Sequence, residues 1–401
     1  MAACGDSGTS HPPLSSNTYT AVIDAGSSGS RLFLYETVPA DNKFGTAKLG
    51  AINKLLIYSG GEALSSFVDS PSEAGPEGVQ PLLDRLDQEL AAHGLDKRDV
   101  SVNVLATAGM RHVDADNPAA SAAIYESVRN TVQAAQYTVG AVGTISGQDE
   151  GLYAWADVNY LKNVFQERGV PYGIVEIGGA SAQVTYVSSA SDNPNVKPVT
   201  INGVGYPVFS ISYRGLGLND ARADMIAGGG VIDNPCYTRG YVFGANSGDP
   251  APAVGVDSLT GNYDYLTCSN LYRDLITSYF QADSPMDAGF SATRFLLTGA
   301  SIPGVLHNWG VTSSGPSSAL SSMAQQHCQG ALWSDFYASF QQYSPSRFLQ
   351  SQCSSSTYLG VLLHDADALG LRTDQTASTP DIDGTATTWT LGYVLISEFG
   401  R

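Results

Sequence analysis

A chain of 401 residues is too long for one ordinary core and suits two lobes. Hydrophobic residues make up 43% of it, which excludes a disordered chain. The net charge of −18 disfavours nucleic acid as a partner, because duplex binding requires clustered Lys and Arg. No run reaches the roughly 18 apolar residues that a membrane helix needs, so we expect no transmembrane segment.

The first predicted unit is a β-hairpin. Residues 1–18 are rich in Ser, Thr, Pro and Gly and predict a disordered tail. An apolar strand then runs from Thr20 to Asp24, a Gly/Ser turn covers residues 26–30, and a second strand covers residues 31–35. The hairpin thus places an acid just before a glycine-rich loop.

The next elements alternate between helix and strand. Leucines at helical spacing predict a helix over residues 79–95, and residues 102–107 predict a buried strand. Asn117 followed by Pro118 is typical of a helix start, and that helix is expected to run to about Ala135. A second amphipathic segment follows Gly147 and extends to about Phe165.

The pattern of the first hairpin then returns. Residues 172–177 form an apolar strand that carries Glu176 near its end, residues 178–181 form a small-residue turn, and residues 183–187 form the next strand. We interpret the two hairpins as an internal duplication of one functional unit.

The remaining segments are less regular. Residues 213–222 predict a turn into a helix with a structural role. Residues 241–262 and 374–387 are polar, and the first of these predicts a surface loop. The apolar residues 388–396 predict a helix or a strand.

Four of the five cysteines suggest two disulfides, Cys236–Cys268 and Cys328–Cys353, and therefore an oxidising compartment. Free buried thiols in a cytosolic protein are the alternative. Cys4 follows two small residues and resembles the end of a bacterial lipoprotein signal, although a disordered tail explains it equally well. No C-x-x-C pair and no zinc-type histidine spacing occurs.

The two Gly/Ser loops suit phosphate. Glycine permits backbone conformations that point successive N–H groups into one concavity, and serine adds hydroxyl donors. Asp24 and Glu176 stand beside these loops, where their negative charge would repel phosphate. A hydrated divalent metal between the carboxylates and the phosphates would explain their position. For one loop alone, a plain hairpin turn is the simpler interpretation; the pair favours phosphate.

Five segments together resemble the ecto-apyrase family, the nucleoside triphosphate diphosphohydrolases. They occur in the family's order and span most of the chain. The segments are residues 22–31 (VIDAGSSGSR), 106–111 (ATAGMR), 145–151 (ISGQDEG), 175–183 (VEIGGASAQ) and 389–393 (WTLGY).

The resemblance implies an α/β fold with two ribonuclease-H-like lobes, as in actin, sugar kinases and heat-shock chaperones, around an interlobe active-site cleft. Residues 19–146 plus 375–401 are expected to form lobe I, and residues 147–374 are expected to form lobe II. A secreted bacterial member is expected, located in the periplasm or outside the cell, and monomeric.

The resemblance also implies roles for individual residues. Glu150 would be the base that activates the attacking water, and Ser181 and Gln183 would orient that water. The hydration shell of Mg²⁺, Ca²⁺ or Mn²⁺ would be held by Asp24, Glu176, Thr107 and Trp389. Nucleotide phosphates would be bound by Ser27, Ser28, Gly29, Ser30, Arg31, Thr107, Arg111, Gly178, Gly179 and Ala180.

Three points remain open. Arg31 and Arg111 are either phosphate contacts or structural partners of acids. Tyr358 is the best match to the family's base-stacking aromatic residue, with core packing as the alternative. The family usually has Asp where this chain has Glu176, which leaves the preferred metal and the rate open.

The expected activity is metal-dependent hydrolysis of the terminal phosphate of nucleoside triphosphates, with diphosphates as a further candidate substrate. An exopolyphosphatase-like enzyme of the same superfamily is the nearest alternative, and the charge of −18 disfavours it. A kinase of the same fold and a non-catalytic nucleotide-binding protein are the others. Phosphate release without an acceptor separates the hydrolase from these two.

Overall fold

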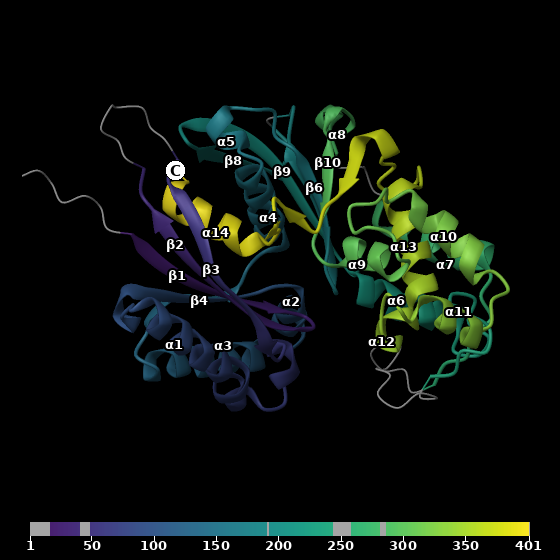
Figure 1. Ribbon diagram of the computed structural model, residues 1–401, viewed down its shortest axis with the longest axis horizontal. Helices are drawn as coiled ribbons and strands as arrows, with labels where there is room; N and C mark the ends of the chain where they lie inside the picture. The colour runs from purple at the N-terminus through teal and green to yellow at the C-terminus, as the bar shows by residue number, and fades with distance from the viewer. Residues whose placement is uncertain (1–16, 41–48, 191, 244–257, 281–285, 401) are drawn as a thin grey trace, which may run out of the picture.

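The structure is a computed structural model that describes residues 17–40, 49–190, 192–243, 258–280 and 286–400. Two mixed β-sheets form its framework, and helices lie on their faces and between them (Figure 1). The predicted tail lies almost wholly outside the described residues, and β1 already begins at Thr18. Cys4 and most of the predicted loop 241–262 also lie outside them.

The first sheet has the strand order β3-β2-β1-β4-β5. β1, β2 and β3 are antiparallel, whereas β4 and β5 run parallel to β1. This confirms the predicted first hairpin and the buried strand that follows it. The strands are β1 (Thr18–Gly26), β2 (Gly29–Val38), β3 (Ala51–Gly61), β4 (Val100–Ala106) and β5 (Thr138–Thr144).

The second sheet repeats this topology. Its order is β11-β10-β6-β7-β9-β8, in which β6, β7 and β9 are antiparallel and β10 and β11 run parallel to β6. β6 therefore corresponds to β1 and β7 to β2, as the duplicated hairpin predicts. The strands are β6 (Gly173–Ile177), β7 (Ser181–Val187), β8 (Val196–Ile201), β9 (Val204–Arg214), β10 (Phe295–Thr298) and β11 (Thr376–Ser378).

Helices α1 and α3 cover the outer face of the first sheet. Leucines of α1 and valines of α3 are buried against β1, β2 and β4. α3 begins as predicted, because the Asn117 side chain accepts a hydrogen bond from the Ala120 N–H. The helices of this lobe are α1 (Gln80–His93), α2 (Ala108–Asp116) and α3 (Pro118–Ala134), with short helical turns at Leu64–Phe67, Pro71–Glu73, Ala74–Val79 and Lys97–Asp99.

Two long helices, α4 (Gly147–Leu161) and α14 (Trp389–Phe399), lie side by side between the two sheets (Figure 1). They share one apolar core with side chains from both sheets. The helix predicted to reach about Phe165 ends earlier, because Asn163 adopts a left-handed backbone conformation that separates α4 from α5 (Val164–Glu167).

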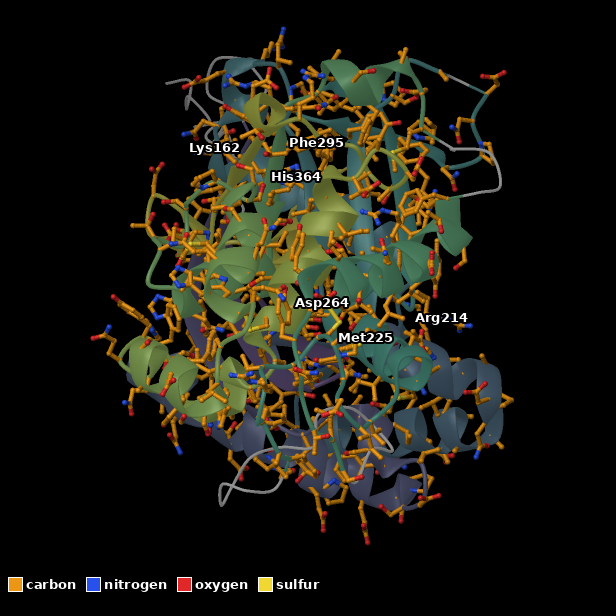
Figure 2. All side chains as sticks on the ribbon, turned by 90° about the vertical axis from the view of Figure 1, so that its right-hand side faces the viewer. Lys162, Arg214, Met225, Asp264, Phe295 and His364 are labelled. Atoms are coloured by element: carbon orange, nitrogen blue, oxygen red, sulfur yellow. A yellow bond between two sulfur atoms is a disulfide. The ribbon has the colours of Figure 1, made fainter. Side chains whose placement is uncertain are left out.

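The second lobe carries a larger helical layer (Figures 1 and 2). The turn predicted before residue 222 is present, with Gly215 at φ +95° leading into α6. The helices are α6 (Leu218–Gly229), α7 (Tyr265–Phe280), α8 (Ala288–Ala292), α9 (Ser301–Asn308), α10 (Ala319–Cys328), α11 (Trp333–Phe340), α12 (Ser346–Leu349) and α13 (Gln352–His364).

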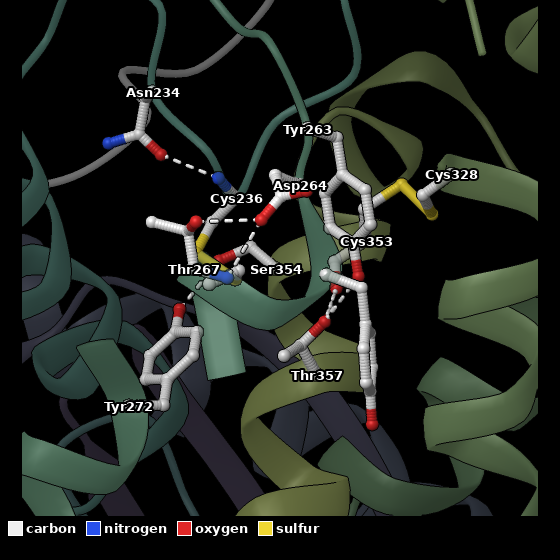
Figure 3. The surroundings of a disulfide bond; sticks show 12 residues. Asn234, Cys236, Tyr263, Asp264, Thr267, Tyr272, Cys328, Cys353, Ser354 and Thr357 are labelled. Atoms are coloured by element: carbon white, nitrogen blue, oxygen red, sulfur yellow. Dashed lines mark hydrogen bonds between the residues drawn. A yellow bond between two sulfur atoms is a disulfide. The ribbon is translucent and has the colours of Figure 1, made fainter. Parts of the chain in front are cut away.

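Both expected disulfides are present, and they tie α7 and α10 to neighbouring segments (Figure 3). Cys236 is joined to Cys268 of α7, and Cys328 at the end of α10 is joined to Cys353 of α13. Close by, Tyr272 of α7 and Ser354 of α13 share a hydrogen bond between their hydroxyls (Figure 3).

The predicted boundary at residue 375 needs one adjustment. Thr376–Ser378 form β11, which pairs with β10 and so belongs to the second sheet. A short hairpin, β12 (Asp381–Ile382) and β13 (Thr385–Ala386), follows before α14 returns the chain towards the first lobe.

Candidate active site

The two Gly/Ser loops face one cleft between the lobes. The β1–β2 turn contains Ser27 and Ser28, and the β6–β7 turn contains Gly178 and Gly179. The loops approach each other so closely that a Cβ on Gly179 would lie 2.7 Å from Ser27 Oγ. A side chain at position 179 would therefore require Ser27 to move, and the two loops are close enough to bind one chain of phosphates.

The cleft has a volume of about 700 Å³, which is the size of a small-molecule site. Twelve of the residues predicted from the sequence line it. They are Asp24, Ser27, Ser28, Arg31, Thr107, Glu150, Glu176, Gly178, Gly179, Ala180, Ser181 and Trp389.

Glu150 lies in the first turn of α4, and its Oε2 is held by two donors. Arg111 Nη2 donates to it at 2.8 Å and Gln183 Nε2 at 3.2 Å. The same two side chains also donate to Ser181 Oγ, at 3.0 and 2.7 Å. Burial raises the pKa of Glu150, and the charge and hydrogen bond of Arg111 oppose that rise. Arg111 and Gln183 thus stand behind the cleft lining and act on it through Glu150 and Ser181.

Asp24 and Glu176 occupy equivalent places in the two hairpins. Asp24 pairs across the ladder with Arg31, and Glu176 pairs with Gln183. Burial raises the pKa of Asp24 to about 7, although the nearby Arg31 and a hydrogen bond from the Trp389 side chain lower it. Burial, reinforced by the Glu150 and Asp24 carboxylates, raises the pKa of Glu176 well above its usual range.

These acids fit a cation held through water. Among the described residues, no group of three or more His, Cys, Asp or Glu side chains is arranged to bind a metal directly. Glu176 Oε2 is nevertheless buried without a hydrogen-bond partner within that part of the chain. Buried acids in mutual repulsion accept a hydrated divalent ion, whose charge offsets theirs and whose waters supply donors.

Besides Arg111 and Gln183, three further predicted residues do not line the cleft. Ser30 is buried and donates its hydroxyl hydrogen bond to the Glu62 carbonyl, and Gly29, at φ +148°, shapes the turn. Tyr358 is only 1% exposed within the second-lobe core, and its hydroxyl donates to the Leu216 carbonyl. Its prediction as a base-stacking residue is wrong in this structure, because core side chains surround the ring.

The sequence did not single out several other lining residues. Asn219 lies beside Gly179, because the backbone N–H groups of Leu218 and Asn219 donate to the Gly178 and Gly179 carbonyls. His307 enters from α9, and Phe33 from β2. Nothing in the local sequence of α9 predicts that His307 lines a site. Asn219 lies within residues 213–222, which we interpreted as a turn into a helix with a structural role.

Comparison with known proteins places these features in a family. A model of the GDA1/CD39 (nucleoside phosphatase) family matches residues 13–398. Mouse ectonucleoside triphosphate diphosphohydrolase 2 is 31% identical over 238 residues, which cover 56% of this chain and 47% of that protein. Probable apyrase 3 of Arabidopsis thaliana is 27% identical over 398 residues, covering 90% of this chain and 77% of that protein. The matches to the first relatives span about half of those relatives' length.

Solved structures share the fold. A nucleoside triphosphate hydrolase of Neospora caninum aligns with a TM-score of 0.60 at 16% identity, covering 95% of this chain and 92% of that one. A Ppx/GppA phosphatase of Aquifex aeolicus aligns with a TM-score of 0.52 at 12% identity, covering 95% and 99%. These solved structures thus show the same fold. With its duplicated loops and its near-complete family match, this chain belongs to the GDA1/CD39 (nucleoside phosphatase) family.

Proposed function

We propose that this chain hydrolyses the terminal phosphate of nucleoside triphosphates, and of diphosphates as a second substrate, with Glu150 as the general base. One observation carries the proposal. Glu150 lines the same cleft as the two Gly/Ser loops, and hydrogen bonds from Arg111 and Gln183 to its Oε2 hold it in place. The names of the relatives, which include a diphosphohydrolase and an apyrase, support the same reaction class.

The arrangement around Glu150 suits activation of a water molecule. Its Oε1 forms no hydrogen bond in the described part of the chain, so that oxygen is available to accept the proton of a water. Ser181 and the Gln183 amide lie beside it and can orient that water in line with the terminal phosphorus. Arg111 lowers the pKa of Glu150 against the effect of burial and so favours the charged carboxylate, which is the form that accepts the proton.

We expect the two Gly/Ser loops and two polar side chains beside them to bind the phosphates. The turns at Ser27–Ser28 and Gly178–Ala180 offer backbone N–H groups and hydroxyls, and Arg31 and Thr107 line the same cleft. These donors add little positive charge. A divalent cation therefore has to accompany the nucleotide in a protein of net charge −18.

Mg²⁺, Ca²⁺ or Mn²⁺ would be held mainly through its waters by Asp24, Glu176, Thr107 and Trp389. When bound, the ion supplies positive charge that neutralises phosphate oxygens. The extra methylene of Glu176, relative to the aspartate usual at this place, affects which ion fits best.

We also propose that the protein works in an oxidising compartment, in the periplasm or outside the cell. Two disulfides in the second lobe support this location, because such bonds are rare in reducing compartments. None of the helices in the described ranges combines the length and apolarity of a bilayer-spanning segment.

The test is acceptor-free phosphate release from ATP, ADP and inorganic polyphosphate, with Mg²⁺ or Ca²⁺ and with excess chelator. Metal-dependent release from ATP is expected, and the ratio of the ATP and ADP rates identifies the end product. The fold shared with Ppx/GppA phosphatases makes polyphosphate the informative competitor. Preference for polyphosphate would replace the proposal with an exopolyphosphatase, and nucleotide binding without release would leave a binding protein or a kinase.

A further inference from the structure

A carboxyl group of α4 holds the start of α14 next to the cleft. Thr388, the residue before α14, donates its backbone N–H to Asp157 Oδ2 at 2.9 Å. The following residue is Trp389, which lines the cleft and whose side chain donates a hydrogen bond to Asp24 of the first lobe. The contact of Asp157 is thus one residue away from a side chain that we place beside the metal.

Asp157 is an unfavourable residue for the stability of the fold at this place. It is 0% exposed, and its Oδ1 has no hydrogen-bond partner among the described residues. Within the same ranges it forms no ion pair, and the nearby Lys54 donates its Nζ hydrogen bond to the Ala386 carbonyl. Burial raises the pKa of Asp157 to about 8, against the opposing effects of the Thr388 N–H and of Lys54. A buried carboxyl group with an unsatisfied oxygen and no cationic partner costs stability, so packing alone does not explain it.

We propose that Asp157 is a positioning residue of the hydrolytic site, which places Trp389 against Asp24 by holding the Thr388 N–H. This role depends on the hydrolysis proposed above. The first N–H groups of a helix have no partner within the helix, and a carboxyl oxygen is a strong acceptor for them. Fixing the backbone at Thr388 fixes the direction in which the next side chain leaves α14, and so keeps the Trp389 indole at Asp24.

The rest of α14 is held independently of Asp157. In its first turn, Thr390 Oγ1 shares a buried hydrogen bond of 2.7 Å with the Tyr35 hydroxyl of β2. One turn along, Gly392 packs so closely on α4 that a Cβ there would lie 1.8 Å from the Tyr153 carbonyl oxygen. Removal of the Asp157 carboxyl group should therefore loosen the residues that lead into α14 and leave the helix docked.

The test compares variants of Asp157 that keep or remove the acceptor. Asp157→Asn keeps an oxygen for the Thr388 N–H, whereas Asp157→Ala and Asp157→Val remove it. Acrylamide quenching of Trp389 fluorescence is measured in the full chain without metal or nucleotide, and the same variants carrying Trp389→Phe give the signal of the other tryptophans for subtraction. Trp389 is 3% exposed in the wild type. We expect its quenching constant to rise roughly twofold or more in both acceptor-free variants, because the start of α14 opens locally, and to stay near the wild-type value in Asp157→Asn.

Steady-state kinetics with ATP supply a second readout. Residues behind the groups that hold a metal typically affect its affinity, so the Mg²⁺ concentration for half-maximal rate should rise roughly tenfold in Asp157→Ala. We expect a smaller change of kcat at saturating Mg²⁺, and a return of the half-maximal concentration towards the wild-type value in Asp157→Asn.

Asn159→Ala is the matched control. Asn159 is equally buried on α4, but its side chain forms hydrogen bonds with the backbone of Trp155 and Tyr172. It should lose stability in urea unfolding without a change in Trp389 quenching. Unchanged quenching in both acceptor-free variants, an equal rise in Asn159→Ala, or an Asp157→Asn variant as impaired as Asp157→Ala would overturn the proposal. Because quenching needs no nucleotide turnover, its failure is distinct from failure of the proposed hydrolysis.

Discussion

At the scale of single residues, Arg111 is the group that favours the charged form of Glu150. The guanidinium comes from α2 in the first lobe and the carboxylate from α4 between the lobes. Burial of Glu150 favours the neutral acid, which cannot accept a proton from water. Arg111 opposes this effect by charge and by hydrogen bonding.

Replacing Arg111 with Gln should therefore shift the pH dependence of hydrolysis. Loss of the positive charge raises the pKa of Glu150, so the acidic limb of the kcat profile should move to higher pH, with a lower rate at neutral pH. Steady-state rates across pH check this, with exposed Arg129→Gln as the control. An acidic limb that stays at its wild-type position would contradict the assigned role.

The residues of the site differ in how far local sequence predicts them. Local sequence is enough to predict Asp24, Glu176 and the loops that follow them. In both hairpins an acid at the end of a strand stands within a few residues of a glycine-rich turn that also contains serine. Tyr358 had no such context, and its aromatic ring is core packing. His307 comes from α9, far along the chain, so only the folded structure brings it to the cleft.

At the scale of elements, the contact of α4 with α14 sets the geometry between the lobes. The two helices cross at Gly392, where a Cβ would lie 1.8 Å from the Tyr153 carbonyl oxygen. The start of α14 then carries Trp389 into the cleft. Close backbone approach is the reason that glycine is needed at position 392.

Gly392→Ala should destabilise the protein by about 1–3 kcal/mol, as overpacked cores do, and should displace Trp389. Denaturant unfolding measures the first effect, and tryptophan fluorescence with bound nucleotide reports the second. Gly228→Ala is the control, because it lies in α6 with nothing within 4 Å of the added Cβ. That variant should be neutral or more stable by up to ~1 kcal/mol. Equal stability of the two variants would contradict the close crossing.

Whether a segment forms a helix or a strand was predictable wherever its hydrophobic periodicity and its capping or turn residues point to the same element. The helix that starts at Pro118 and the two hairpins are confirmed. The end of α4 was not predictable, because the left-handed conformation of Asn163 depends on packing. β11 lies in a polar stretch without strand periodicity, and only its pairing with β10 reveals it.

At the scale of the whole molecule, a strongly acidic protein carries the cleft that we propose for a polyanionic nucleotide. The lobes contact each other at the cleft margin, where His112 of α2 lies 3.2 Å from Asp220 of α6. The resemblance to the ecto-apyrase family implied the fold class, and the duplicated hairpin agreed with it. The relative placement of the lobes, by contrast, depends on α4 and α14. The charge of −18 acts over longer distances and opposes approach of the nucleotide.

Screening of that charge should favour substrate binding. Between 0.01 and 0.15 M salt the Debye length falls from about 30 Å to about 8 Å, so repulsion weakens. We expect the KM for ATP at fixed excess metal to fall roughly two- to fivefold over this range. Initial rates in a non-coordinating salt check this. A KM that rises with salt would indicate net electrostatic attraction and contradict the argument.

The most direct measurement is phosphate release by Glu150→Gln beside its binding of a non-hydrolysable ATP analogue. Gln keeps the shape and loses the basicity, so we expect kcat to fall by about 10²–10⁴-fold while the analogue's Kd changes little. Exposed Glu167→Gln on α5 is the control. Hydrolysis at the wild-type rate by Glu150→Gln would contradict the account, because the water would then be activated by another group.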